Sequence, residues 1–305
     1  MSFIIRRILI SIPVLIIVSF IVFGMLFLSG DPVILMLPPG STQEQVDSFR
    51  RAYGFDDPFL VQYGRFLFNA LRGDLGRSIR YNEPALDLVL QRLPATIQLA
   101  GTSVLIAILI SLPLGTFAAL KRNSFIDYTA SFISVLGQSM PNFWLGFLLI
   151  YAFAVNLHWL PTSGGPGFPY VLLPAMTIGF NVVALATRMT RSAFLENLGE
   201  DYVRTARGKG VPEYLVIIRH TARNSILPVF TVLALQFGYI LGGAVVVETL
   251  FAWPGLGLLI IQAIYNRDYP LTQAAVLFLA VSFVLINLIV DIVYQFLDPR
   301  VRNGN

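Results

Sequence analysis

Long apolar runs alternate with shorter polar segments along this chain. Formal charges are absent from residues 8–28, 93–120 and 128–187, and two further apolar runs lie near 226–247 and 271–291. A helix needs about 20 residues to cross a bilayer, so each run is long enough to span one, and the run of sixty residues at 128–187 is long enough for two. The pattern predicts an all-α membrane protein with six transmembrane helices.

Turn residues divide the longest run and set the other boundaries. Residues 161–169 read Pro-Thr-Ser-Gly-Gly-Pro-Gly-Phe-Pro, which excludes a continuous helix there. The apolar stretch 258–265 is too short to cross and is interpreted as an interfacial or re-entrant piece. We expect an N-terminal cytoplasmic end with the first helix at 1–30, an extracytoplasmic segment at 31–92, a membrane core at 93–297 with helices at about 95–120, 129–156, 171–189, 226–247 and 271–291, and a cytoplasmic tail at 298–305.

The segment between the first two spans has a different character from the rest. It carries eight acidic residues and seven arginines, as expected for a segment outside the membrane. Ser41 and Glu44 have the spacing of a capping box, which predicts a helix over 42–53. Asp57 as a cap and Pro58 as a first helical residue predict a second, amphipathic helix after it.

Composition narrows the class of protein further. Hydrophobic residues make up 56% and charged residues 12% of the chain, and this balance indicates that the bilayer is its solvent. The absence of cysteine excludes disulfides, thiolate metal sites and a cysteine nucleophile. His158 and His220 lie far apart, so we predict no metal site, and we predict membrane lipid rather than nucleic acid as the surroundings.

Basic residues give the orientation, since they favour the cytoplasmic side of short membrane loops. In a six-span arrangement most of them fall on one side. The 190–225 loop on that side is net positive, whereas the 157–170 loop on the other has no formal charge. The sequence therefore predicts a multi-pass protein of the bacterial inner membrane with both termini in the cytoplasm. The basic groups that set this orientation are Arg6, Arg7, Lys121, Arg122, the 190–225 loop, Arg300 and Arg302.

Catalytic chemistry has no candidate residues in this sequence. The spans lack a paired catalytic constellation, and the chain lacks the G-x-x-x-x-G-K-[ST] loop that cradles nucleotide phosphates. We therefore predict a transport subunit rather than an enzyme, without a cofactor of its own, and expect any ATP and Mg²⁺ to be used by partner subunits. Arg188 and Arg191 are interpreted as interfacial anchors at the end of the fourth span. Four polar residues within the spans could line a pathway or join helices: Gln138, Asn142, Asn181 and Gln236.

The polar segment 201–223 reads as helix, glycine turn, helix. Gly208 and Gly210 break the first helix, and Pro212 can begin the second. Such a layout suits docking on another protein, and it equally suits a basic loop lying on anionic headgroups. Composition leaves both readings open.

A series of motifs in this order resembles the type 1 ABC transporter permeases of the dipeptide and oligopeptide group, whose relatives also handle glutathione and nickel. The resemblance covers nearly the whole chain. The motifs are Arg6-Arg7, Gly30-Asp-Pro32, Gly73-Asp-Leu-Gly-Arg-Ser78, Arg92-Leu-Pro-Ala-Thr96, Pro141-Asn-Phe-Trp-Leu-Gly146, Asp201-Tyr-Val-Arg-Thr-Ala-Arg207, Glu248-Thr-Leu-Phe-Ala-Trp-Pro-Gly-Leu-Gly257, Arg267-Asp-Tyr-Pro270 and Asp298-Pro-Arg300.

This resemblance implies a function and a coupling site. In the family, the loop before the fifth span docks a short helix on the ATPase subunit, which here implies Arg204, Thr205, Ala206 and Gly210, with Glu213 in the same loop. Arg204 stands where many permeases have glutamate, which favours the peptide branch.

The implied complex is an ATP-driven importer. It would contain a second permease, either a paralogue or a second copy, two cytoplasmic ATPase subunits and an extracytoplasmic solute-binding protein. The implied substrate is a dipeptide, an oligopeptide or a peptide-like solute such as glutathione, with nickel or another small solute as the alternative. An ion-coupled secondary transporter is the rival class, and it would need ionisable residues at the bilayer midplane.

Overall fold

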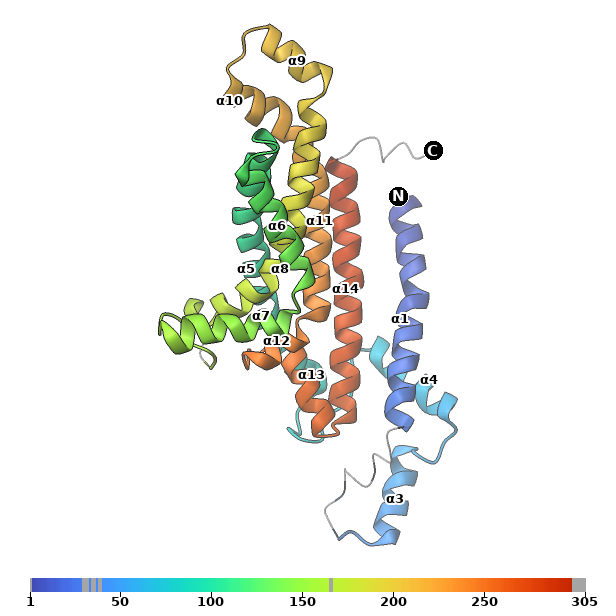
Figure 1. Cartoon of the computed structure of the whole chain (residues 1–305). Helices are drawn as coiled ribbons and strands as arrows, with labels where there is room; N and C mark the ends of the chain where they lie inside the picture. The colour runs from blue at the N-terminus through green and yellow to red at the C-terminus, as the bar shows by residue number, and fades with distance from the viewer. Residues whose placement is uncertain (1, 29–32, 34–36, 38–39, 165–166, 298–305) are drawn as a thin grey trace. The chain divides into compact units, whose positions relative to one another are not determined.

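A computed structural model describes residues 2–28, 33, 37, 40–164 and 167–297. The predicted tail at 298–305, with its Asp298-Pro-Arg300 motif, and the Gly30-Asp-Pro32 motif lie outside the described residues. Regular structure in the described part is helical (Figure 1). The elements are α1 (Ser2–Leu28), α3 (Gln43–Tyr53), α4 (Phe59–Leu71), α5 (Ala85–Leu120), α6 (Phe125–Ser139), α7 (Asn142–Leu149), the π-helix η1 (Ile150–Asn156), α8 (Phe168–Leu198), α9 (Asp201–Gly208), α10 (Glu213–Leu215), the π-helix η2 (Val216–Thr221), α11 (Ala222–Gly243), α12 (Val245–Leu250), α13 (Leu256–Tyr265) and α14 (Tyr269–Leu297).

The described helices include four that are long and apolar enough to cross a bilayer, and a bent pair that makes a fifth candidate. The apolar stretch Leu9–Met25 of α1 is shorter. These findings agree with a multi-pass, all-helical membrane protein. The four helices are Ala85–Leu120, Phe168–Leu198, Glu213–Gly242 and Tyr269–Val290, and the pair is Phe125–Ser139 with Asn142–Asn156.

The third predicted span differs from the expectation of one helix over 129–156. Its two parts, α6 and α7–η1, are bent by 110° at a short break. Met140 at the break is extended, with φ −84° and ψ 126°. Pro141 explains the break, because proline pushes the preceding residue out of the helical region and has no N–H for the helix ladder. We name this break, residues 139–141, the elbow.

Residues of the chain form two compact units, Met1–Thr96 with Pro254–Leu285 and Ile97–Trp253 with Ile286–Asn305. In the first unit, α4 packs against α1 through aromatic side chains. The ring centroids of Phe20 and Tyr63 are 5.2 Å apart in a T-shaped arrangement, and Phe23 contacts Phe59 at 5.5 Å. Ser19 Oγ lies 2.9 Å from Tyr63 Oη. The amphipathic pattern of α4 therefore has its partner in α1.

The start signals of α3 and α4 are placed differently from the predictions. The capping box of α3 consists of Thr42 and Gln45, one residue later than the predicted Ser41 and Glu44. Thr42 has the extended backbone that a cap requires, and Gln45 Oε1 accepts from its N–H at 2.9 Å. The prediction that Asp57 caps α4 is wrong, because its carboxylate is paired with Arg65 at 2.5 Å.

A second core in the same unit joins the start of α5 to α13 and α14. The predicted short apolar piece is the helix α13, and its first N–H, that of Leu256, donates to Thr96 Oγ1 at 2.8 Å. Apolar residues from the three helices pack together here and are almost completely buried. They are Ala85, Val89, Leu256, Leu259, Ile260, Ala263, Leu271, Ala274 and Ala275.

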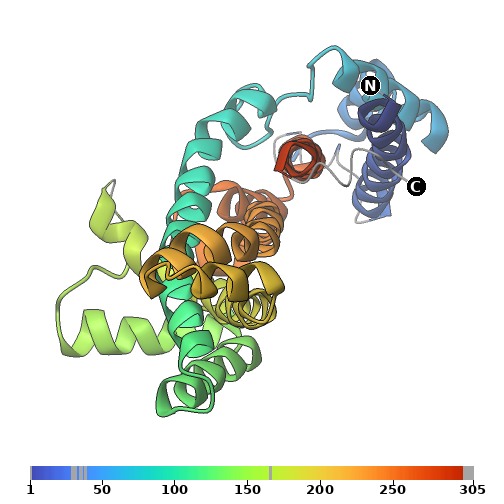
Figure 2. The same cartoon turned by 90° about the horizontal axis from the view of Figure 1, so that it is seen from above.

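In the second unit, α8 packs against both α6 and α11 (Figures 1 and 2). Small residues allow the backbones to approach closely. A Cβ added at Gly137 of α6 would lie 2.6 Å from Ala184 Cβ of α8, and one at Gly179 would lie 3.1 Å from the Ser103 carbonyl oxygen of α5. Such close contacts are typical of helices that associate inside a membrane.

Candidate functional site

The 201–223 segment folds back on itself between α8 and α11. Helix α9 ends at Gly208, and Gly210 has a φ of +76°, a conformation that favours glycine. Pro212 precedes the first residue of the next helix, Glu213, and that helix continues to Gly242. The segment is therefore a short helix and a turn built directly onto a long apolar helix.

Apolar contacts hold α9 on the helix that follows it. Val203 and Val216 are completely buried, Ala206 is 6% exposed, and Val211 packs against the three of them. Ala206, one of the predicted coupling residues, therefore belongs to the internal packing of the segment. A small side chain is required at this position for α9 to lie close to η2.

An ion pair closes the turn between the two helices. Arg207 donates from Nε and Nη2 to the Glu213 carboxylate at 3.1 and 2.7 Å. By accepting these hydrogen bonds, Glu213 raises the pKa of the Arg207 guanidinium. Both side chains are about half exposed, so the pair adds little stability but fixes the geometry of the turn. The predicted residue Glu213 is thus one partner of an ion pair across the turn, which we call the Arg207–Glu213 brace.

The outward side chains of the segment are available for contacts. Arg204 is 72% exposed, and its pair with the exposed Asp201 is long, at 3.6 Å. Thr205 donates its hydroxyl to the Asp201 carbonyl at 2.8 Å. Two large side chains, Tyr214 and Ile218, are 62% and 67% exposed. A basic group and apolar surface thus lie exposed on a rigidly built segment.

Asn181 of α8 has a structural role at the elbow. Pro141 has no N–H to donate to the carbonyl of Gly137 four residues earlier, and Asn181 Nδ2 donates to that oxygen instead, at 3.3 Å. An unsatisfied carbonyl in a membrane costs several kcal/mol, so this bond supports the bend. The bond joins α8 to α6, and a pathway role for Asn181 stays a prediction.

The other three predicted polar residues are not brought into one site. Gln138 and Asn142 lie exposed on either side of the elbow, and Gln236 of α11 is partly buried. None of the three has a hydrogen bond to another described residue. Their role as pathway residues stays a prediction.

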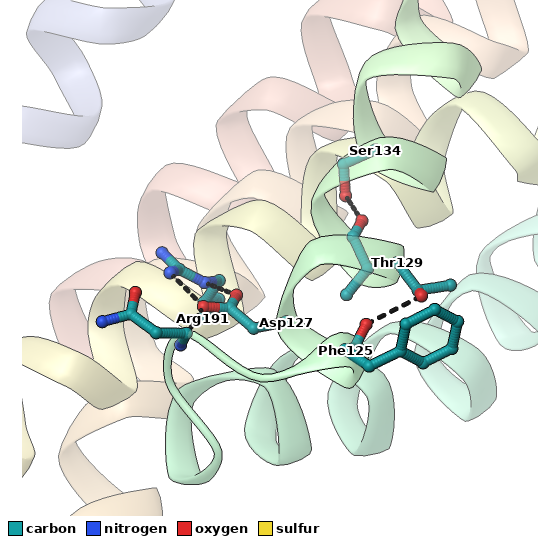
Figure 3. Close-up of polar contacts among 7 residues, drawn as sticks. Phe125, Asp127, Thr129, Ser134 and Arg191 are labelled. Atoms are coloured by element: carbon teal, nitrogen blue, oxygen red, sulfur yellow. Dashed lines mark hydrogen bonds and ion pairs between the residues drawn. The ribbon is translucent and has the colours of Figure 1, made fainter.

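A buried ion pair at the start of α6 was missed by the sequence prediction. Arg191 donates from Nε and Nη2 to both oxygens of Asp127, at 2.5 and 2.8 Å (Figure 3). The Asn123 N–H also donates to this carboxylate, at 2.9 Å. Asp127 is only 4% exposed in its side chain. The pair joins the first turn of α6 to α8, so Arg191 has a more specific role than interfacial anchoring.

The sequence contains the signal for this pair. Asp127 and Arg188 bound the sixty uncharged residues, with Arg191 one turn further on. Two antiparallel helices bring the ends of such a run to the same side, where opposite charges can meet.

Two motifs that are 190 residues apart meet at Asp268, which is 1% exposed. Its carboxylate accepts hydrogen bonds from the Ser78 hydroxyl at 2.5 Å and from the Ile79 and Arg80 N–H groups at 3.2 and 3.1 Å. It also caps α14, accepting from the Leu271 N–H at 3.2 Å. The Gly73–Ser78 and Arg267–Pro270 motifs therefore build one structural joint.

Comparison with known proteins adds the decisive observation. Residues 111–303 match the family described as the binding-protein-dependent transport system inner membrane component, and residues 1–100 match its N-terminal counterpart. The chain belongs to this family. Proteins of Escherichia coli and Shigella dysenteriae called glutathione transport system permease protein are each 41% identical over 303 residues, covering 99% of both chains.

Solved structures agree with the family at the level of the fold. A crystal structure described as an amino acid ABC transporter with histidines has a TM-score of 0.51 and 17% identity to this chain, covering 70% of it and 94% of the other chain. The chain is therefore a multi-pass inner-membrane component of a transport system, with an ABC permease fold.

Proposed function

We propose that this chain is the permease subunit of an ATP-driven importer for a peptide-like solute such as glutathione. The observation that carries the substrate class is the 41% identity to glutathione permeases along 99% of both chains. Dipeptides and oligopeptides are close chemical relatives of this substrate, and nickel or another small solute is the alternative within the family.

The proposed topology has six spans, with α1 as the first and the bent pair α6 to η1 as the third. The basic groups that set the orientation then face the cytoplasm together with both termini, and residues 31–92 are extracytoplasmic. In this arrangement the loop held by Asp268 lies outside, and the α9–α10 turn lies in the cytoplasm.

The proposed partners supply what this chain lacks. Two cytoplasmic ATPase subunits would bind and hydrolyse ATP with Mg²⁺, a second permease, a copy or a paralogue, would complete the pathway, and an extracytoplasmic binding protein would deliver the solute. Alternating access requires two states of the permease, with the ATPases favouring one of them.

The 201–223 segment is the proposed docking site for an ATPase subunit. Its support is the combination of a rigid base and an exposed surface. The buried cluster around Val203 and the Arg207–Glu213 brace hold the turn, while Arg204, Tyr214 and Ile218 remain exposed. A preorganised surface loses less entropy on binding than a flexible loop would.

Gly210→Pro tests this site, because proline cannot adopt the φ of +76° found there. We expect the variant to insert in the membrane as the wild type does but to lose the ATPase subunits during co-purification. Deletion of 204–210 should have the same effect. Gly164→Pro is the matched control, since Gly164 also has a positive φ, +96°, in a different loop with open space around it. Normal recovery of the ATPase subunits with Gly210→Pro would exclude this docking site.

A further inference from the structure

Tyr202 of α9 lies at the centre of a hydrogen-bonded chain that connects three helices. Its hydroxyl donates to Asn197 Oδ1 of α8 at 2.8 Å, and it accepts from Asn224 Nδ2 of α11 at 3.1 Å. One side-chain oxygen therefore links the helix before the 201–223 segment to the helix after it.

This chain of bonds closes into a ring at the carbonyl of Ala193 in α8. Asn197 Nδ2 donates to that oxygen at 2.8 Å. The Ser225 hydroxyl, next to Asn224, lies 3.2 Å from the same oxygen and shares its single proton with the Thr221 carbonyl, 2.9 Å away. Ser225 is completely buried. The ring, which consists of Ala193, Asn197, Tyr202, Asn224 and Ser225, joins α8, α9 and α11 where they converge.

The hydrogen bonds of this ring depend on direction, whereas the apolar packing of α9 does not. The cluster of Val203, Ala206 and Val216 holds α9 against η2, but apolar surfaces can slide with little loss of contact. Hydrogen bonds weaken steeply when their angles change. The ring therefore links α9 to the adjoining ends of α8 and α11 by bonds whose geometry a shift of α9 would disturb.

We propose that Tyr202 is the positioning residue that transmits movement of the docked α9 to α8 and α11. This inference rests on the proposed function, because it assumes that an ATPase subunit moves α9. Tyr202 itself need not contact the ATPase. Its hydroxyl acts through Asn197 and Asn224.

Tyr202→Phe tests the proposal, with Tyr128→Phe as the control for loss of a tyrosine hydroxyl. Tyr128 of α6 is 65% exposed and lies outside the proposed docking site, and the described residues offer its hydroxyl no hydrogen-bond partner. The complex with its ATPase subunits is purified and placed in proteoliposomes. Two quantities are measured, the rate of ATP hydrolysis and the ATP-dependent change in maleimide labelling of an Asn142→Cys reporter. This chain contains no cysteine, so label found on this chain comes from the reporter position alone.

We expect Tyr202→Phe to retain its ATPase subunits and hydrolyse ATP at nearly the wild-type rate. The ATP-dependent labelling change at Asn142→Cys should fall by at least about two- to tenfold, the range for one net hydrogen bond, because Tyr202→Phe removes two. Tyr128→Phe should match wild type in both measurements. Asn224→Ala should reproduce part of the loss, and the double variant should be no worse than Tyr202→Phe alone, because the bond lost in Asn224→Ala is one of the two that Tyr202→Phe removes.

Two results would overturn the inference while leaving the docking site intact. The first is a labelling change in Tyr202→Phe equal to that of Tyr128→Phe, and the second is loss of the ATPase subunits from Tyr202→Phe, which would make Tyr202 a contact residue. Failure of the wild-type chain to retain ATPase subunits would instead contradict the proposed function.

Discussion

Arg191→Met is expected to lower the free energy of unfolding by about 2 to 3 kcal/mol, because it leaves the buried Asp127 carboxylate without its partly exposed partner. Asp127 is 4% exposed in its side chain, and Arg191 supplies two of its hydrogen bonds. Methionine fills a similar volume but cannot donate. The measurement is the thermal stability of the purified protein in detergent.

Two further variants separate the charge effect from a packing effect. Arg188→Met, one turn earlier on the same helix, should change little, because Arg188 is exposed and forms no ion pair with another described residue. Adding Asp127→Asn to Arg191→Met should recover much of the stability, because the buried charge is then removed. Equal losses for the Arg188 and Arg191 variants would show that the pair does not stabilise the fold.

Asp268→Ala is expected to have the second large effect and to lower the free energy of unfolding by about 3 kcal/mol. The change removes the cap of α14 and leaves the Ile79 and Arg80 N–H groups and the Ser78 hydroxyl without their acceptor. Thermal stability and the rate of proteolytic cleavage within residues 76–85 measure this loss. The cleavage rate should rise because the loop is released from α14.

Asp74→Ala is the control for this joint. Asp74 is exposed, and among the described residues its carboxylate accepts one hydrogen bond, 2.9 Å long, from the Gly76 N–H. Its loss should alter stability by well under the effect at Asp268. A loop that resists proteolysis equally in the Asp268 and Asp74 variants would contradict the role of Asp268 as the joint.

Hydrophobic patterning predicted much of the fold because each apolar run had to be helical to satisfy its backbone in a membrane. Local signals were less reliable where neighbouring residues compete. Thr42 and Gln45 form the same capping pattern as Ser41 and Glu44, and the backbone at Thr42 decided between them. Pro141 was visible in the sequence, but its effect depends on Asn181, which satisfies the carbonyl that the proline leaves without a donor.

The candidate site was predictable only as a segment. The glycine turn and the motif at 201–207 indicated where the segment lies. The role of each residue within it could be assigned only from the tertiary structure. Ala206 is buried, Glu213 braces Arg207, and Arg204 remains exposed. The ring at Tyr202 joins residues from three helices, and no local pattern predicts which hydroxyl will meet which amide. Long-range pairs such as Ser78 with Asp268 have the same limitation.

Cysteine cross-linking in the intact complex tests the central claim most directly. The chain contains no cysteine, so an Arg204→Cys variant carries one reactive thiol. With a short bifunctional maleimide and ATPase subunits that carry surface cysteines, we expect a covalent product of the permease and an ATPase subunit. Tyr81→Cys, on the loop held by Asp268, should give no such product. An ATPase product from Tyr81→Cys together with none from Arg204→Cys would contradict both the docking site and the orientation.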